Sequence, residues 1–442
     1  MLVELTIENF RSIAEPATVT FAAGATSQLS GNLLRLRNGE RIVKSMALYG
    51  PNASGKTTLL EGLYAIRSFV QFSSQDQKPT AKIPQFEPFA LDSALSKRPS
   101  RISLTIGLDG DRFTFEVAAT THRVWSESLK VQHMSKQPSR KTQARTLLKR
   151  TWQPSKKVYA TELHEAFGTE LTRSGAIEQT TPNRLMVGKL ASMNSDLARR
   201  IFEWFDDDLD FYDMHRNPNS EDLALAECAR LLGEDKTFAA IVARFMKDAD
   251  TGIRELRIVD EKTFEPVFSE SDMEFKETIQ PGLSFRHNTE DGSEVFLLRQ
   301  RESSGTLRFV AMLAAIFKPG PRRRLICIDE LSASMHPELV RRLIRLVHSS
   351  RYNGRGNQLI FTTHDTHLLD PKELLRRDQV TICSKDRFGR SSTKRLDEFQ
   401  DAARSDANLQ KQYLQGRFGG LPQFGPSLED VPVDEEAMEV GA

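Results

Sequence analysis

The sequence has little cysteine, and none of it is spaced to bind a metal. Three cysteines, Cys228, Cys327 and Cys383, lie far apart in 442 residues. This excludes a disulfide-stapled extracellular fold and the paired-cysteine pattern of a zinc site. Cys327 and Cys383 sit inside apolar runs, so we expect them to be small core residues of a protein from a reduced, cytoplasmic compartment.

Long apolar runs and an excess of one charge are also missing. The longest apolar stretch, Phe309–Phe317, is much shorter than the about 20 residues that a membrane-spanning helix needs. The first residues carry Glu4 and Glu8 and lack the basic and apolar regions of a secretory signal. The net charge is +1, which points to no partner by itself. We therefore expect no membrane partner.

A phosphate-binding loop is present at residues 50–57, which read GPNASGKT and match G-x-x-x-x-G-K-[ST]. It lies between an expected strand at 47–49 and an expected helix at 57–72. Backbone N–H groups of such a loop surround a phosphate, and the helix dipole adds to the attraction. We predict that Lys56 reaches the β- and γ-phosphates of ATP and that Thr57 holds Mg²⁺. The residues predicted to bind the nucleotide here are Gly50, Pro51, Asn52, Ala53, Ser54, Gly55, Lys56, Thr57 and Thr58.

Two carboxylates end a second apolar strand, expected at 325–328. Asp329 is predicted to bind the Mg²⁺ shell, and Glu330 to orient and polarise the attacking water. A strand followed by a solvated turn has the same composition. The phosphate loop earlier in the chain favours the catalytic interpretation.

Two weaker motifs accompany these. His364 follows the strand expected at 358–362, and from there it can donate a hydrogen bond to the γ-phosphate. Residues 302–306, ESSGT, open a helix expected at 307–317 and leave N–H groups accessible to an anion. An ordinary helix N-cap looks the same. The other motifs favour the interpretation that Ser304 and Gly305 bind nucleotide.

The order of these motifs resembles the ABC-type ATPase head of the SMC, RecF and OLD group. The opening residues 5–12, LTIENFRS, also resemble the first strand and turn of that group. Residues 302–307, 331–337 and 408–417 are similar to stand-alone AAA-type ATPases of bacterial defence islands, of the RloB-associated and abortive-infection type. The resemblance extends to about residue 425 and is weakest over 120–250. It implies an α/β fold: an ABC-type P-loop ATPase head, with a mixed sheet covered by helices on both faces and a largely helical insert.

The resemblance also implies an assembly. In such heads two chains pair head to tail around two ATP molecules, and larger oligomers can be built from that dimer. Ser304 and Gly305 would then act on the partner's ATP, while residues 334–337 would cross the interface. Residues 302–306 stand where ABC ATPases have their signature motif, and their sequence is not the glycine-rich LSGGQ of transporters. Gln85 is the candidate for the glutamine that follows the first helix, and Arg11 is a candidate to approach the nucleotide.

Composition suggests four regions. An N-terminal lobe with the phosphate loop spans 1–132, and a mostly helical insert with a basic segment spans 133–250. A C-terminal lobe with the signature, the carboxylates and the histidine spans 251–425, and an acidic, disordered tail spans 426–442. Residues 136–157 hold eight Lys or Arg and no Asp or Glu; they form either a surface for nucleic acid or an acidic partner, or a solvated loop. With the acidic and aromatic run at 203–213, we expect residues 120–250 to project as a partner-binding lobe.

Three functional classes fit an ATPase of this type. A transporter subunit is disfavoured by the lack of a membrane segment. A RecF-like or SMC-like ATPase of DNA repair or maintenance stays open, although no sustained heptads support long-range bridging. We favour a switch in antiphage defence. Because 78 residues follow His364, too few for a Toprim nuclease, the effector (a Toprim or RloB-like nuclease, or a toxin) is expected on a separate chain.

Overall fold

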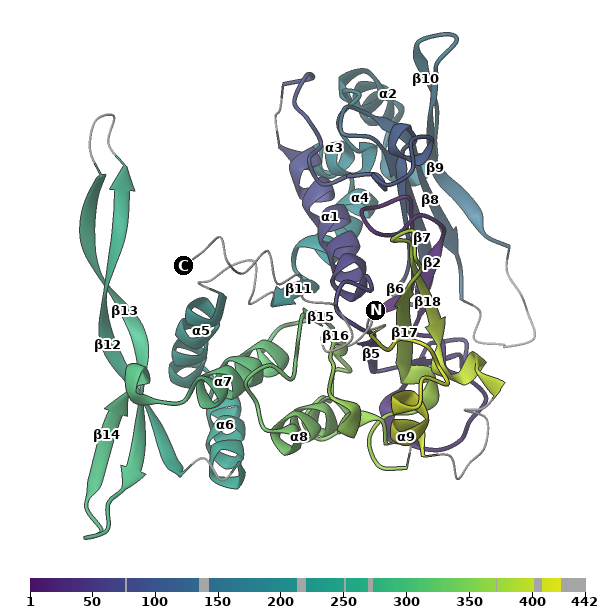
Figure 1. Ribbon diagram of the computed structural model, residues 1–442. Helices are drawn as coiled ribbons and strands as arrows, with labels where there is room; N and C mark the ends of the chain where they lie inside the picture. The colour runs from purple at the N-terminus through teal and green to yellow at the C-terminus, as the bar shows by residue number, and fades with distance from the viewer. Residues whose placement is uncertain are drawn as a thin grey trace, which may run out of the picture.

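The computed structural model describes residues 1–75, 78–134, 143–212, 220–249, 252–268, 273–370, 372–400 and 408–422 (Figure 1). The helices are α1 (Lys56–Ser74), α2 (Glu170–Gln179), α3 (Met186–Ser192), α4 (Asp196–Asp206), α5 (Ser220–Glu234), α6 (Lys236–Asp248), α7 (Ser304–Phe317), α8 (Pro337–His348) and α9 (Leu409–Leu414). The acidic tail expected at 426–442 lies outside these ranges. Within them, no helix is long and apolar enough to cross a membrane.

The nucleotide-binding motifs lie on a six-stranded sheet in the order β11-β15-β16-β5-β17-β18. Its strands are β5 (Ser45–Tyr49), β11 (Leu209–Tyr212), β15 (Leu325–Ile328), β16 (Gln358–Thr362), β17 (Val380–Lys385) and β18 (Ser391–Arg395). The first five strands in this order are parallel to one another, and β18 is antiparallel to β17. The expected strands at 47–49, 325–328 and 358–362 are therefore confirmed, and the sheet is mixed as predicted.

Helices cover both faces of this sheet, which follows from the alternation of side chains along a strand. Met46 and Leu48 of β5 pack into one hydrophobic cluster with α1. Ala47 and Tyr49 point the other way, into a second cluster with α7 and α8. Every residue of β5 is buried, as expected for a parallel strand covered on both faces. The predicted α/β class with helices on both faces is confirmed.

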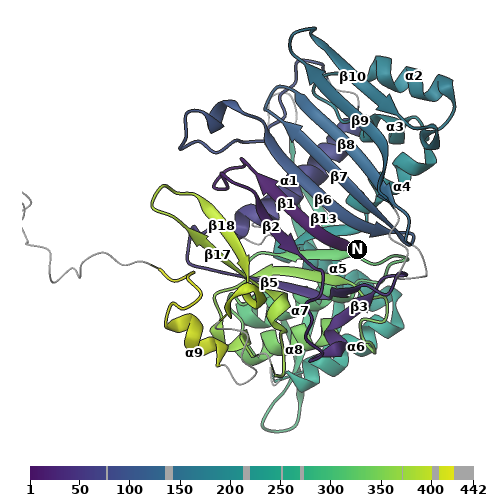
Figure 2. The same cartoon turned by 90° about the vertical axis from the view of Figure 1, so that its right-hand side faces the viewer.

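A second, antiparallel sheet of seven strands forms the N-terminal part of the molecule, in the order β10-β9-β8-β7-β6-β1-β2 (Figure 2). Its strands are β1 (Leu2–Glu8), β2 (Ala17–Thr20), β6 (Ser100–Leu108), β7 (Asp111–Ala119), β8 (Val124–Gln132), β9 (Arg145–Gln153) and β10 (Val158–Leu163). Asp109 and Gly110 join β6 to β7 with φ of 50° and 90°, the left-handed pair of a type I′ hairpin turn. Helices α1, α3 and α4 pack together against its core.

The structure differs from the expected helical insert at its beginning. Strand β9 pairs with β8, and β10 pairs with β9, so residues 145–163 extend the N-terminal sheet rather than a helical lobe. Helices do dominate from 170 to 248 among the described residues. Of the basic run at 136–157, the first part lies outside the described residues. The side chain of Arg150 is buried and donates to the carbonyl oxygens of Arg184 and Thr180 at 2.7 and 3.2 Å.

The acidic and aromatic run at 203–213 is also placed differently from the expectation. It was predicted to form one face of a projecting lobe, but Trp204 and Phe205 are buried in the core. Strand β11 adds an edge to the nucleotide-binding sheet by pairing with β15. Arg322 contacts the nearby acidic side chains Glu203 and Asp207 at 2.6 and 2.7 Å. The run is therefore structural within one chain.

Three strands stand apart from both large sheets: β12 (Ile253–Phe268), β13 (Met273–Asn288) and β14 (Glu294–Leu298). The hairpin of β12 and β13 lies at one side of the molecule, beyond α5 and α6 (Figure 1). These helices contact its base, which buries Leu283 and Phe285. The small remaining sheet pairs β3 (Leu33–Arg35) with β4 (Arg41–Val43).

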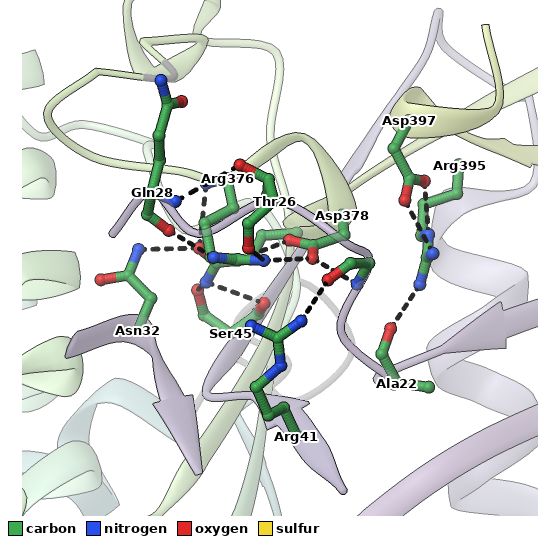
Figure 3. A network of polar contacts seen from close by, with 12 residues as sticks. Ala22, Thr26, Gln28, Asn32, Arg41, Ser45, Arg376, Asp378, Arg395 and Asp397 are labelled. Carbon is green, nitrogen blue, oxygen red and sulfur yellow. Dashed lines mark hydrogen bonds and ion pairs between the residues drawn. The ribbon is translucent and has the colours of Figure 1, made fainter. Parts of the chain in front are cut away.

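A buried polar network fixes the beginning of β5 (Figure 3). The guanidinium of Arg376 donates to both carboxylate oxygens of Asp378, at 2.9 and 2.7 Å, and to the carbonyl oxygen of Thr26 at 3.1 Å. Gln379 donates to the hydroxyl of Ser45, the first residue of β5, at 2.7 Å. Arg376 and Asp378 are 0% and 1% exposed, so this ion pair has no access to water. The network ties the 22–32 loop to the strand that carries the phosphate loop.

Candidate nucleotide site

The loop at 50–55 connects β5 to α1 and closes tightly. Gly50 and Gly55 have φ of 152° and 96°, which L side chains rarely adopt. A Cβ at Gly50 would clash with the carbonyl oxygen of Cys383, and one at Gly55 would lie 2.5 Å from Oγ of Ser391. Both glycines are therefore required by close approach as well as by backbone conformation. The loop leaves Asn52 and Ala53 exposed at its tip.

Lys56, the first residue of α1, lies folded back over this loop. Its Nζ donates to the carbonyl oxygens of Gly50 and Pro51, both at 2.9 Å. Burial lowers the pKa of Lys56, and the thiol of Cys383 and the carboxylates of Asp329 and Glu330 oppose that shift. The lysine is thus held in a partly buried position beside both carboxylates, within reach of a phosphate in the loop.

Thr57 and Asp329 meet although 272 positions separate them in the chain. The Thr57 hydroxyl donates to the two Asp329 oxygens at 3.2 and 3.0 Å. Thr362, at the end of β16, donates to the same carboxylate at 2.6 Å and accepts from the N–H of Glu330 at 2.7 Å. The carboxyl ends of neighbouring parallel strands bring these groups together, as the topology requires.

Glu330 and His364 follow the ends of β15 and β16. Glu330 has a left-handed φ of 50°, and its carbonyl oxygen accepts from Arg308 of α7 at 2.6 Å. Burial lowers the pKa of His364, and the charge of Lys56 lowers it further, so this imidazole is neutral at neutral pH. The charges of Lys56, Asp329 and Glu330 all act on His364, and both carboxylates act on Lys56, so these four side chains lie close together.

Ser304 and Gly305 lie at the start of α7. Ser303 is the N-cap, and its hydroxyl accepts from the N–H of Thr306 at 3.1 Å. A Cβ at Gly305 would clash with the carbonyl oxygen of Ser334, so the signature packs directly on the 334–337 segment. Within the described chain, no hydrogen bond or ion pair joins Ser304 or Gly305 to the phosphate loop. In one chain Ser304 is exposed at the helix start, while Gly305 is half-buried against Ser334.

Comparison with known families agrees with this geometry. A family model described as "AAA domain, putative AbiEii toxin, Type IV TA system" matches residues 45–370. The chain belongs to this AAA family. Among solved structures, the SMC head domain from Thermotoga maritima is similar over 89% of this chain and 98% of its own, with 11% identity and a TM-score of 0.36. No curated protein sequence matches.

The oxygen atoms at the AAA site fit the chemistry of magnesium. Mg²⁺ prefers hard oxygen ligands and usually takes one or two from the protein, with the rest from phosphates and water. The Thr57 hydroxyl and the Asp329 carboxylate already lie at hydrogen-bond distance from each other. Among the described residues, no group of three or more His, Cys, Asp or Glu could hold a metal without other ligands. Thr57 and Asp329 are therefore the residues that would hold Mg²⁺ delivered with ATP.

Several residues that support the AAA site escaped the sequence analysis. Arg308 is buried and reaches the backbone of Asp329 and Glu330; a lone arginine in the apolar run after 307 was the available signal. Ser12 contacts Thr58 at 3.1 Å and Ser391 at 2.9 Å, making a row of hydroxyls beside Gly55. Ser12 lies in the LTIENFRS segment, whereas nothing in the sequence marks Ser391.

Two weaker candidates do not join the site. Arg11 pairs with Glu61 of α1 and lies 3.4 Å from the carboxylate of Glu87. The side-chain oxygen of Gln85 is buried and, within the described chain, has no hydrogen-bond partner. Neither residue is connected to the phosphate loop or the carboxylates by a hydrogen bond or ion pair among the described residues. Their proposed roles at the nucleotide stay predictions.

Replacing Lys56 with Ala should weaken nucleotide binding. A hydrogen bond to a charged group contributes about 1.5–3 kcal/mol, which corresponds to a rise in Kd of about 10- to 100-fold. Isothermal titration of the purified variant with ATP and with ADP measures this change. Lys82→Ala, an exposed lysine outside the site, is the control. An unchanged Kd in Lys56→Ala would contradict the assignment of the loop.

Proposed function

We propose that this AAA-family chain binds MgATP, dimerises around it and hydrolyses it, and so acts as a molecular switch. The observation that carries the proposal is the set of hydrogen bonds from the Thr57 hydroxyl to Asp329, from Thr362 to Asp329, and from the Glu330 N–H to Thr362, which join the ends of β15 and β16 to the start of α1. Mg²⁺ supplied with ATP would neutralise charge on the phosphates. Phosphoryl transfer needs little beyond this positioning and charge stabilisation.

Each of these side chains then has a distinct task in hydrolysis. Lys56 leaves the carbonyl oxygens of Gly50 and Pro51 and binds the β- and γ-phosphates. Glu330 accepts a proton from the attacking water and orients it toward the γ-phosphate. His364, neutral because burial lowers its pKa, donates a hydrogen bond to a γ-phosphate oxygen. Lys56 lies in α1, Glu330 follows β15 and His364 follows β16, so three different elements bring these side chains to one site.

The start of α7 supports head-to-tail pairing. Ser303 and Ser304 are exposed, so the N–H groups beside them are open to an anion from another molecule. Gly305 packs on Ser334, which is itself exposed with a φ of 59°. In the proposed dimer, Ser304 and Gly305 cap the ATP bound to the partner, and residues 334–337 lie along the interface. Each active site is then assembled from two chains.

Mixing two inactive variants tests this assembly. Lys56→Ala removes the phosphate-loop lysine, and Gly305→Asp displaces Ser334 and repels phosphate, so each variant should be inactive alone. In a one-to-one mixture, half of the random pairs are mixed and each holds one intact composite site, so about a quarter of wild-type phosphate release should return. Phosphate release by the mixture, at concentrations that allow dimers, is the measurement.

A second mixture is the matched control. Lys56→Ala combined with Glu330→Gln places both changes on the side of the site contributed by the same chain, so no composite site is intact. Activity should stay at background in this mixture. Return of activity in both mixtures would overturn the head-to-tail model. If neither mixture recovers, the wild-type chain is mixed one to one with Lys56→Ala: about half of wild-type phosphate release means that single intact sites work and overturns the model, whereas about a quarter means that both sites must be intact together.

We further propose that the switch controls a separate effector in bacterial antiphage defence. The family description, which names a putative toxin of a toxin–antitoxin system, supports that setting. In the described chain, the motifs discussed above serve the proposed nucleotide site. The effector, a nuclease or toxin, would therefore be a second protein. Co-expression of this chain with the products of neighbouring genes, followed by affinity purification with ATP or with ADP, tests the idea. Capture of an effector in one nucleotide state supports it, and equal absence in both states contradicts it.

A further inference from the structure

A cavity of about 1040 Å³ adjoins the phosphate loop on the side of His364. One side is formed by Gly50, Pro51, Asn52 and His364, and the other by residues near the end of the described chain. We call residues 408–422, which include α9, the C-terminal wall. Helix α9 lies beside β17 and β5 in both views (Figures 1 and 2). The cavity is therefore bounded by the start of the loop and by a segment that the motifs leave without a function.

The C-terminal wall is attached to two parts of the nucleotide site. The ring of Tyr413 meets the ring of Tyr49, the residue before the loop, edge to face at 5.9 Å. Tyr413 also donates its hydroxyl proton to the carbonyl oxygen of Gly420 at 2.7 Å, which closes the wall on itself. Gln410 donates to the hydroxyl of Thr366, two residues after His364, at 3.2 Å. The wall thus contacts both the loop strand and the segment that follows the histidine.

Gly420 makes the tightest contact between the wall and the sheet. Its φ is 68°, and a Cβ there would lie 2.7 Å from the side chain of Ile382 in β17. The adjacent carbonyl of Cys383 is the same group that a side chain at Gly50 would meet. The wall and the phosphate loop therefore press against neighbouring points of one strand. A movement of the phosphate loop on binding a phosphate would therefore shift the C-terminal wall.

Lys385 ends β17 and lines the same cavity. It is exposed, and within the described chain its ammonium group makes no hydrogen bond or ion pair, although its backbone lies in the β17–β18 ladder. The carboxylate of the next residue, Asp386, is occupied by the N–H groups of Phe388 and Arg390, at 2.9 and 2.8 Å. An ammonium group without a protein partner, next to a phosphate loop, is suited to bind phosphate as a point charge. His364, which we propose binds the γ-phosphate, lines the same cavity as Lys385.

We infer that Lys385 and the C-terminal wall complete the ATP site within the same chain. Lys385 binds the γ-phosphate, and Tyr413 is a positioning residue that holds the wall against the loop. ADP lacks the phosphate that Lys385 contacts, so these residues select ATP over ADP. The inference rests on the proposed ATPase function and adds to it a nucleotide-sensing element outside the loop, the carboxylates and the signature.

Binding of ADP and of a non-hydrolysable ATP analogue to the full chain tests the inference. Lys385→Ala should raise the Kd for the ATP analogue about tenfold, the effect of one modest charge contact, and leave the Kd for ADP within about twofold. Raising the salt concentration should weaken analogue binding less in this variant than in the wild type, since an exposed charge contact is screened by salt. Lys411→Ala is the matched control, because Lys411 is an exposed lysine in the wall but outside the cavity lining.

Tyr413→Phe keeps the ring against Tyr49 and removes only the hydroxyl bond to Gly420. It should lower the preference for the ATP analogue over ADP while the thermal midpoint of the protein stays close to that of the wild type. An equal loss of affinity for both nucleotides in Lys385→Ala, or no loss for either, would overturn the inference. If Lys56→Ala binds as well as the wild type, the proposed function has failed; if Lys56 is needed and Lys385 is not, only the inference has failed.

Discussion

Glu330→Gln is expected to slow ATP hydrolysis by about 10²–10⁴-fold, the usual contribution of a general base, while ATP binding stays intact. The reason is positional. Glu330 follows the carboxylate that contacts Thr57, and its backbone is held from two sides, by the hydroxyl of Thr362 and by Arg308. An amide at this position keeps the shape of the side chain and cannot accept the proton of water. Steady-state phosphate release and ATP titration on the same preparation separate the two effects.

The variant should also trap the proposed dimer. With hydrolysis blocked, ATP stays between the two chains, so the protein should elute at twice its mass in size-exclusion chromatography with ATP and at its single mass with ADP. Glu398→Gln, an exposed carboxylate away from the site, should behave as the wild type. Near-normal turnover in Glu330→Gln would remove Glu330 from the mechanism. If Glu330→Gln elutes at the mass of one chain with ATP, the proposed head-to-tail dimer is contradicted, even if hydrolysis is slowed.

The parts of the fold closest to the nucleotide could be predicted from the sequence because local signals agree there. The strands at 325–328 and 358–362 were placed with the correct ends, and the one at 47–49 begins two residues too late. Each is an apolar run that ends in a polar motif, and burial on both faces makes such runs continuous. The meeting of Thr57 with Asp329 follows from the parallel order of β5, β16 and β15, which brings their carboxyl ends to one edge.

The strands β9 and β10 could not be predicted because their stabilising contacts are remote and polar. In the sequence, Arg150 makes this segment resemble a solvated basic loop. In the structure its side chain is buried and donates hydrogen bonds to backbone carbonyls 30 or more residues away. Trp152, two residues further along β9, is covered by the guanidinium of Arg123 at 4.0 Å. A change of Arg150 to Glu would therefore disturb the sheet, and it cannot test a nucleic-acid surface.

Strand β11 was missed for a related reason. Its acidic surroundings suggested an exposed face, but Arg322 and Arg324 supply the opposite charges from a segment more than 100 residues later. Burial raises the pKa of Asp208 to about 6, and Arg322 opposes that shift. Composition over a short window cannot show such pairing. Likewise, the role of Ser304 and Gly305 depends on a second chain, so their place at the nucleotide stays a proposal.

Replacing Arg376 with Met is expected to lower the free energy of unfolding by about 3–5 kcal/mol, the cost of leaving one member of a buried ion pair without its partner. Methionine retains much of the volume and removes the donors, so Asp378 would keep only the N–H of Gly24, at 2.6 Å, as a partner in the network (Figure 3). The carbonyl oxygen of Thr26 would lose its donor as well. Urea unfolding followed by fluorescence measures the loss.

The pair Arg395–Asp397 is a matched control drawn in the same view (Figure 3). It has the same spacing and two hydrogen bonds, at 2.6 and 2.8 Å, but its side chains are 14% and 25% exposed. Water can solvate Asp397 once the arginine is gone, so Arg395→Met should cost about 1–2 kcal/mol, including the bond to Ala22. Adding Asp378→Asn to Arg376→Met should restore part of the stability, because it removes the unpaired charge. Equal losses for Arg376→Met and Arg395→Met would show that burial of the first pair does not determine its contribution.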